Sequence, residues 1–408
     1  MKATDSDYTR RKFITTAASG LAVAGLTALP GGGVIAQQAQ KAENTQDKKI
    51  IYRTLGKTGI KLPIVSMGVM NAGNPSLIQA SYDAGIRHFD TAAVYQYGAN
   101  EQQVGNVIKK MGVRDKVIIG TKIYTPDQRS DLSAAGLKKK LMTLTEGSLT
   151  RLKTDYIDIL YLHSISSADE VNNPAVIEAC NYLKESGKVS FIGLSTHSHM
   201  AEVINEAVKV GIYDVILTAI NFTMADDTTL LNAIKNASDK GIGIIAMKTM
   251  AGGSQWPDPE SRQNYSSSVI ATAALKWVMR NKNIATAIPG YTNLDHMDED
   301  FSVAYNLDYS PEEKKFLGDN KVKLSIGFCR QCGKCMAVCP NGVDIPTLMR
   351  TYMYAAQYSN YHLACETLNE IPRHKSIEKC LSCSTCSVRC ANTVNIAQRI
   401  DALKMMYT

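Results

Sequence analysis

The chain has 408 residues, 45% of them hydrophobic, which is enough for one large folded domain and a smaller one. The formal net charge is +7, but Lys and Arg are spread along the chain with no basic run beyond the first dozen residues, which argues against nucleic-acid binding. Eight of the ten cysteines fall in two short runs between Cys329 and Cys390, and such clustering favours metal ligation over disulfides.

The first 36 residues have the three-part layout of a secretory signal. Arg10 and Arg11 precede a mild apolar stretch, Ala17 to Leu29, and the pair resembles the twin-arginine type of signal, which carries folded cargo. A cytosolic basic tail and a membrane anchor are the alternatives, although an anchor needs about 20 strongly apolar residues. We therefore expect a signal peptide over residues 1–36, a polar linker over 37–49, export to the periplasm, and no stable membrane span after signal cleavage.

From Ile50 to about Tyr291, short β-branched runs alternate with helical stretches. Eight strands separated by helices over roughly 240 residues predict an α/β fold, a closed parallel (β/α)8 TIM barrel. A hairpin over Tyr52–Gly59 is expected to plug its bottom. A doubly wound sheet is the alternative, but it would want a Gly-x-Gly-x-x-Gly turn after the first strand, and none follows Gly68. The predicted strands are Leu62–Gly68, His88–Thr91, Val117–Lys122, Ile157–His163, Ser190–Ser195, Val215–Ile220, Ile242–Lys248 and Thr286–Pro289.

Polar side chains collect where these strands end, which is the end of a barrel that carries active sites. Asp90 ends the second strand, Tyr95 follows it, Lys122 ends the third and His163 the fourth. Each alone has a common structural explanation, such as a helix cap or a packed ring. A charge inside an apolar run costs free energy unless it is paired, so we expect Asp90 to pair with Lys122.

Residues 50–315 resemble the aldo-keto reductase family. The match rests on Phe89–Tyr95 with Asn100-Glu101, then Thr121-Lys122, Leu162-His163, Gly193–Thr196, Ile288–Gly290 and Glu299-Asp300. The resemblance implies hydride transfer between a nicotinamide cofactor and a small carbonyl or alcohol substrate. It makes Tyr95 the proton donor, Lys122 the ammonium that lowers the pKa of Tyr95, Asp90 the partner that holds Lys122, and His163 the residue that orients the carbonyl.

The same resemblance implies a set of cofactor-binding residues: Ser195, Thr196, Asn221, Lys248, Gly252, Gly253, Gly290, Glu299 and Asp300. The seventh loop, Ala251–Ser268, is the candidate lid. Members that use NADP usually place a lysine where Gly290 stands and an asparagine where Asp300 stands, and Leu217 replaces a glutamine that contacts the carboxamide. The cofactor is therefore expected to be NADP or NAD.

The cysteine runs predict a small, mainly helical domain over residues 316–408. Cys329, Cys332, Cys335 and Cys339, followed by Pro340, have the spacing of the bacterial ferredoxin motif, and Cys380, Cys383, Cys386 and Cys390 repeat it. Zinc is the alternative, but zinc sites usually use two cysteine pairs split by a longer gap. We expect two [4Fe-4S] clusters. In two-cluster ferredoxins the fourth cysteine serves the other cluster, which would join Cys390 to the first run and Cys339 to the second.

The remaining cysteines and the tyrosines of the C-terminal domain are assigned structural roles. The tyrosines at 352, 354, 358 and 361 are expected to pack rather than to form an electron path, and Cys180 and Cys365 to be buried bystanders.

The sequence thus predicts an NAD(P)-dependent oxidoreductase coupled to iron-sulfur electron transfer, with a redox protein as a possible partner and no nucleic-acid partner. The alternatives are a regulatory protein that holds nucleotide without turnover and a pure electron-transfer protein.

Overall fold

The structure, a computed structural model, describes residues 49–125, 132–252 and 264–407. The predicted signal peptide and nearly all of the linker lie outside the described residues. Residues from Ile50 onward form one compact unit. Within the described ranges, no helix is long and apolar enough to span a membrane.

A hairpin of β1 (Tyr52–Thr54) and β2 (Lys61–Pro63) precedes the barrel, and its strands pair antiparallel. The predicted hairpin was right in place but too short, because Leu62 and Pro63 belong to it and not to the first barrel strand. Pro63 has no N–H to continue a ladder, and the barrel strand starts only at Met67. Leu55 and Leu62 pack against side chains inside the barrel, so the hairpin plugs one end of it.

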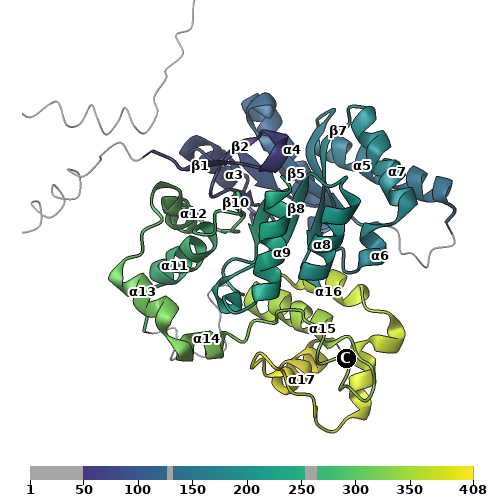
Figure 1. Cartoon of the computed structure of the whole chain (residues 1–408), viewed down its shortest axis with the longest axis vertical. Coiled ribbons are helices and arrows are strands. Elements are labelled where there is room, and N and C mark those ends of the chain that lie inside the picture. The colour runs from purple at the N-terminus through teal and green to yellow at the C-terminus, as the bar shows by residue number, and fades with distance from the viewer. Residues whose placement is uncertain (1–48, 126–131, 253–263, 408) are drawn as a thin grey trace, which may run out of the picture. The chain divides into compact units, whose positions relative to one another are not determined.

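Eight parallel strands form the barrel, each paired with the next along the chain (Figure 1). Backbone hydrogen bonds from Ser66 to Ala287 (2.8 Å) and from Gly68 to Pro289 (2.9 Å) join the last strand to the first. The predicted (β/α)8 fold is confirmed. The strands are β3 (Met67–Gly68), β4 (His88–Asp90), β5 (Ile118–Ile123), β6 (Ile157–Leu162), β7 (Val189–Thr196), β8 (Val215–Ala219), β9 (Gly243–Met247) and β10 (Thr286–Ala287).

Helices surround the strands and bury their apolar faces against them. Side-chain caps mark where several begin: Ser133, Asn173, Asp227 and Ser266 each accept a hydrogen bond from a backbone N–H of the first turn. The barrel helices are α3 (Pro75–Ala84), α4 (Ala99–Met111), α5 (Ala134–Leu152), α6 (Ala168–Val171), α7 (Pro174–Glu185), α8 (Met200–Val210), α9 (Thr228–Asp239), α11 (Ser267–Met279) and α12 (Leu294–Ser302).

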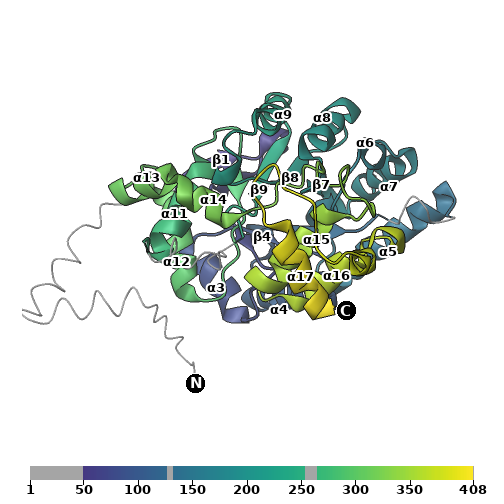
Figure 2. The ribbon, with the colours of Figure 1, turned by 90° about the horizontal axis from the view of Figure 1, so that it is seen from below.

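The C-terminal region is mainly helical, as predicted (Figure 2). It has a small apolar core that includes Leu348, Ile377 and Ile400. The predicted domain boundary at residue 315 falls inside α13. The elements are α13 (Pro311–Gly318), α14 (Asn320–Ile326), α15 (Ile345–Tyr352), the π-helix η6 (Met353–Gln357), α16 (Tyr361–Asn369), the 3-10 helix η8 (Ile377–Ser382) and α17 (Ile396–Tyr407). We call residues 328–407 the cysteine module.

Candidate active site and cysteine clusters

Asp90 and Lys122 form a buried ion pair. They end or nearly end the neighbouring strands β4 and β5, and their side chains are each 2% exposed. Lys122 Nζ also donates to the carbonyl of Thr91, at 2.6 Å. Burial raises the pKa of Asp90 and lowers the pKa of Lys122, and the attraction between the two charges opposes both shifts. The pair expected from the sequence is present.

Tyr95 lies beside this pair, at the start of the 3-10 helix η2 (Tyr95–Gly98) that follows β4. The Nζ atom of Lys122 is 5.0 Å from the centre of the Tyr95 ring. The pKa of Tyr95 is not lowered overall, in contrast to the sequence-based expectation. Burial, and then the charge of Asp90, raise it well above 10.0.

His163 follows β6 and faces two tyrosine rings. Its ring is 6.2 Å from that of Tyr95 and stacks at 4.5 Å on that of Tyr124. Burial, and then the charges of Lys122, Lys248 and Arg350, hold the pKa of His163 well below 6.5, so the imidazole is neutral. Its buried Nδ1 has no hydrogen-bond partner among the described residues, which leaves it free to bond a ligand.

A cavity of about 1570 Å³, open to solvent, is lined both by predicted catalytic residues and by predicted nucleotide-binding residues. Asp90, Tyr95 and Lys122 line it, and so do Lys248, Gly290, Glu299 and Asp300. Leu217, which stands where the family places a glutamine, lines it as well. His163 adjoins this cavity through Tyr95 but does not line it.

Three predicted cofactor residues lie apart from this lining, because their polar groups serve the backbone. The hydroxyl of Ser195 accepts a hydrogen bond from the N–H of Ser164 at 2.9 Å, and that of Thr196 donates to the carbonyl of Ser198 at 3.0 Å. Asn221 caps the 3-10 helix η4 (Phe222–Met224). Of the glycine pair, Gly252 lies against Gln357 of the cysteine module; Gly253 and most of the candidate lid lie outside the described residues.

Side chains of the cysteine module also line the cavity, and sequence reasoning missed them. Tyr354, Gln357 and Tyr358 come from η6 and the residue after it, and the phenol of Tyr354 accepts a hydrogen bond from Lys248 Nζ at 3.0 Å. Tyr354 and Tyr358 also pack in an apolar cluster with Met353 and Leu363, as expected of the module's tyrosines, whereas Tyr361 is 60% exposed. A π-helix carries no sequence signal of its own, although such turns are frequent at functional sites.

A second contact between module and barrel lies beside His163. Glu370 of the module pairs with Arg350 and accepts a hydrogen bond from the hydroxyl of Tyr124 at 2.8 Å. Tyr124 in turn stacks on His163, so the module positions one wall of the candidate active site.

Three cysteines of the first run and one of the second surround a separate void. Cys329, Cys332, Cys335 and Cys390 line this small cavity, together with apolar side chains that include Ile345 and Val394. The grouping expected from crossed ligation thus exists in space. The side-chain amide of Gln331 donates to the sulfur of Cys329 at 3.3 Å, and the N–H of Asn392 donates to that of Cys390 at 3.2 Å.

The other four cysteines form a second group. Cys380 lies close enough to Cys339, Cys383 and Cys386 for their charges to act on its thiol. The amide of Asn341 donates to the sulfur of Cys383 at 3.2 Å. N–H donors aimed at cysteine sulfurs are characteristic of iron-sulfur sites.

The two groups fit four-iron clusters. Four thiolates set around a void hold such a cube at its corners, and the first void has apolar walls. Of the remaining cysteines, Cys180 is buried as expected, whereas Cys365 is exposed.

Comparisons with known proteins agree with the assignment of both the barrel and the cysteine module. The aldo/keto reductase family model matches residues 74–268, and a 4Fe-4S dicluster domain model matches residues 328–395. The chain is 28% identical over 293 residues to L-galactose dehydrogenase of Arabidopsis thaliana, which covers 64% of this chain and 90% of that protein. It is 30% identical over 221 residues to the uncharacterized oxidoreductase YrpG of Bacillus subtilis, covering 50% of this chain and 67% of that protein.

A solved aldo-keto reductase from Bacillus halodurans, in its holo form, superposes with a TM-score of 0.53 at 21% identity, covering 66% of this chain and 95% of that one. At this identity the likeness shows the fold. Together with the family model and the relatives, it places the protein: the chain belongs to the aldo/keto reductase family of oxidoreductases and carries a C-terminal 4Fe-4S dicluster domain.

Proposed function

We propose that the protein transfers hydride between a nicotinamide nucleotide and a small carbonyl or alcohol, and that the cysteine module exchanges electrons with a partner redox protein. The observation that carries the proposal is the single cavity that Tyr95 and Lys122 share with Lys248, Gly290 and Glu299. The catalytic and nucleotide-contacting predictions came from distant parts of the chain, and the fold brings them to one space. We assign the barrel to residues from 50 to the end of α13 and the module to the residues after α14.

A nicotinamide bound in the cavity supplies the hydride. Tyr95 then donates its phenolic proton to the oxygen of the reduced carbonyl. Its raised pKa keeps the phenol protonated, and an alkoxide is basic enough to take the proton. Neutral His163 donates a hydrogen bond to the same oxygen and orients it. Lys122, held by Asp90, places a positive charge 5.0 Å from the Tyr95 ring, where it stabilises the phenolate left behind.

The test is oxidation of NADH on addition of benzaldehyde. We expect one benzyl alcohol for each NADH consumed. A protein that binds NADH and leaves the aldehyde unchanged would be the nucleotide-holding regulator instead, and one that does neither would be an electron-transfer protein alone.

We propose that the nucleotide is NAD rather than NADP. The described residues that line the cavity include two lysines, Lys122 and Lys248, both near the catalytic end, together with His296 and no arginine. The adenosine end offers Gly290, Glu299 and Asp300. Burial, then Glu299, raise the pKa of Asp300 to about 8, so at neutral pH it is a neutral hydrogen-bond donor and Glu299 carries the negative charge. A carboxylate suits a ribose hydroxyl and repels a 2′-phosphate.

We expect NADH to bind at least about tenfold more tightly than NADPH, measured by fluorescence titration at constant ionic strength, because like charges placed side by side cost several kcal/mol. Glu299→Gln should narrow the difference by improving NADPH binding. Asp298→Asn, which removes an exposed neighbouring charge, is the matched control and should leave the ratio unchanged. Equal or tighter binding of NADPH by the unaltered protein would refute the assignment.

We further propose that the two cysteine groups hold [4Fe-4S] clusters. The first cluster would be held by Cys329, Cys332, Cys335 and Cys390, and the second by Cys380, Cys383, Cys386 and Cys339. Each cluster carries one electron at a time, so the module suits exchange with a one-electron partner.

The N-terminal signal remains our proposal for export to the periplasm by the twin-arginine route, which would carry the chain already folded around its clusters. We expect Arg10→Lys together with Arg11→Lys to hold the precursor in the cytoplasm, measured by fractionation and immunoblotting. Lys2→Arg and Lys12→Arg, which keep the twin arginines, form the control and should be exported. Export of the double-lysine variant would point to another route.

A further inference from the structure

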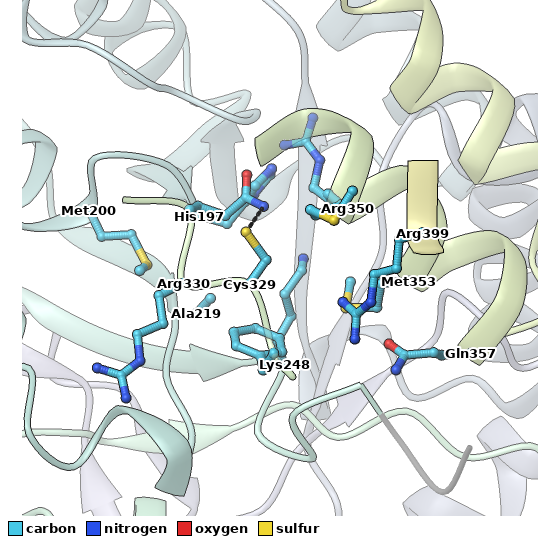
Figure 3. Close-up of a pocket in the computed structure, with 13 residues that line it drawn as sticks. His197, Met200, Ala219, Lys248, Cys329, Arg330, Arg350, Met353, Gln357 and Arg399 are labelled. Atoms are coloured by element: carbon cyan, nitrogen blue, oxygen red, sulfur yellow. Dashed lines mark hydrogen bonds between the residues drawn. The ribbon is translucent and has the colours of Figure 1, made fainter. Parts of the chain in front are cut away.

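A small cavity, drawn in Figure 3, shares lining residues with both the first cysteine group and the nucleotide cavity. Cys329 lines it on the module side. Lys248 and Gln357 line both this small cavity and the nucleotide cavity, so these two side chains separate the first group from the nucleotide site. No cysteine of the second group lines either space among the described residues. The first cluster is therefore the inner one.

Arg399, from α17, lines the same small cavity and is 4% exposed (Figure 3). Its guanidinium lies 5.0 Å from the centre of the Tyr352 ring and donates to the carbonyl of Ile326 at 3.5 Å. Across the part of the chain that the structure describes, no carboxylate pairs with it. A buried cation without a counter-charge is costly, so its counter-charge has to come from another group.

The cysteines of the first group supply that charge. Cys329 lines the same small cavity as Arg399; burial lowers the pKa of Arg399, and the charges of Tyr352, Cys329 and Cys390 oppose that shift. A [4Fe-4S] cluster with four thiolates is an anion, and each electron that it accepts makes it more negative. A fixed buried cation beside it therefore favours the reduced state and raises the reduction potential. The hydrogen bonds that Gln331 and Asn392 donate to sulfurs of this group act in the same direction.

The second group has a weaker electrostatic environment. Two cations lie at this group: exposed Arg389, which donates to the carbonyl of Cys386 at 3.2 Å, and Lys404, whose side chain is 19% exposed and pairs with Asp401 at 3.7 Å. Water and the carboxylate both reduce the effect of Lys404 on the sulfurs. One side-chain amide, that of Asn341, donates to this group at Cys383.

We propose that Arg399 sets the reduction potential of the first cluster above that of the second, so that a single electron in the module rests on the first cluster, beside the nucleotide cavity. The proposal rests on the two-cluster assignment above. The step is an intramolecular one-electron transfer: the second cluster is oxidised and the first is reduced, with no proton or ligand exchanged. Arg399 is a positioning residue here, because it touches neither substrate nor nucleotide.

The experiment is an anaerobic redox titration of the full chain followed by electron paramagnetic resonance. We expect two separate reduction waves. Arg399→Gln should lower the upper wave, so that at the wild-type midpoint the ratio of reduced to oxidised cluster falls at least tenfold, which is 59 mV for one electron. The lower wave should not move. Arg399→Lys keeps the charge and should shift the upper wave less. Gln331→Leu removes the hydrogen bond to Cys329 and should lower the same wave.

Lys404→Gln is the matched control, and it should leave the upper wave in place. The proposal is overturned if Arg399→Gln moves neither wave or only the lower one, or if Arg399→Lys moves the upper wave as far as Arg399→Gln. Should Arg399→Gln fail to fold, Arg399→Lys and Gln331→Leu test the proposal in its place. If Gln331→Leu leaves the midpoint of the upper wave unchanged, that wave does not belong to the first cluster. Failure of the cluster assignment itself is a different result, seen beforehand as iron missing from the unaltered protein.

Discussion

Replacing Tyr95 with phenylalanine is expected to lower aldehyde reduction at least about a hundredfold, the lower range for loss of a general acid. The substitution keeps the aromatic ring and removes the hydroxyl that donates the proton. Tyr95 lines the cavity beside the Asp90–Lys122 pair, whereas the other two phenols that line it, Tyr354 and Tyr358, come from the cysteine module. The measurement is the rate of NADH oxidation at saturating benzaldehyde, with NADH affinity determined separately and expected to be unchanged.

Tyr97 offers the control, since it is two residues away and 80% exposed, and Tyr97→Phe should keep full activity. Lys122→Met should lose activity as Tyr95→Phe does, because it removes the charge that stabilises the phenolate. Full activity of both the Tyr95 and the Lys122 variants would remove the proposed chemistry.

The pH profile gives an independent check on the same residue. The pKa of Tyr95 is raised above 10.0, so the phenol stays protonated through neutral pH and would be lost as an acid only above that value. The pKa of His163 is lowered below 6.5, so the imidazole stays neutral above that value. At saturating NADH and aldehyde, where the titration of Asp300 in the nucleotide site does not limit binding, the rate of carbonyl reduction should therefore be level between pH 6.5 and 10.0. A rate that rises or falls with a midpoint near neutral pH would contradict these two pKa shifts.

Cys390→Ser is expected to abolish the first cluster and to spare the second. Cys390 belongs to the second run of the sequence but lines the void around Cys329, Cys332 and Cys335. Iron should fall from about eight to about four atoms per chain, because one of two four-iron clusters is lost. Cys365→Ser is the control, since Cys365 is exposed and lies in neither group, and it should keep all its iron.

The spectrum of the remaining cluster identifies which one was lost. Cys390→Ser should leave the same resonance signal as Cys332→Ser, and Cys339→Ser the same signal as Cys380→Ser. If instead the Cys390 variant matches the Cys380 variant, each run holds its own cluster and the crossed grouping is wrong.

Local patterns predicted much of the fold. The barrel strands are short apolar runs bounded by polar or glycine residues, and the structure places all eight within a few residues of their predicted positions. The Asp90–Lys122 pair followed from the cost of a lone charge in an apolar run. The first strand was the exception, because Leu62 and Pro63 continue the apolar run but pair with β1 across the hairpin.

The features that the sequence did not predict depend on contacts between segments that are distant in the chain. Nothing near Tyr354 in the sequence indicates Lys248, which lies 106 residues earlier, so the module's share of the cavity wall was not predictable. The pKa of Tyr95 is raised by its burial and then by the charge of Asp90, and burial depends on packing that strand order does not reveal. Ser195, Thr196 and Asn221 were expected in the nucleotide site, yet short polar side chains at strand ends also satisfy nearby backbone groups.

The central claim is that hydride passes directly between nucleotide and substrate in the cavity that holds Tyr95 and Lys122. It is tested by supplying NADH that carries deuterium at its transferable position, together with benzaldehyde, and analysing the benzyl alcohol by mass spectrometry. The account predicts one deuterium on the alcohol carbon per turnover in ordinary water, and none when ordinary NADH is used in heavy water. Alcohol whose new carbon-bound hydrogen comes from the solvent would contradict direct transfer.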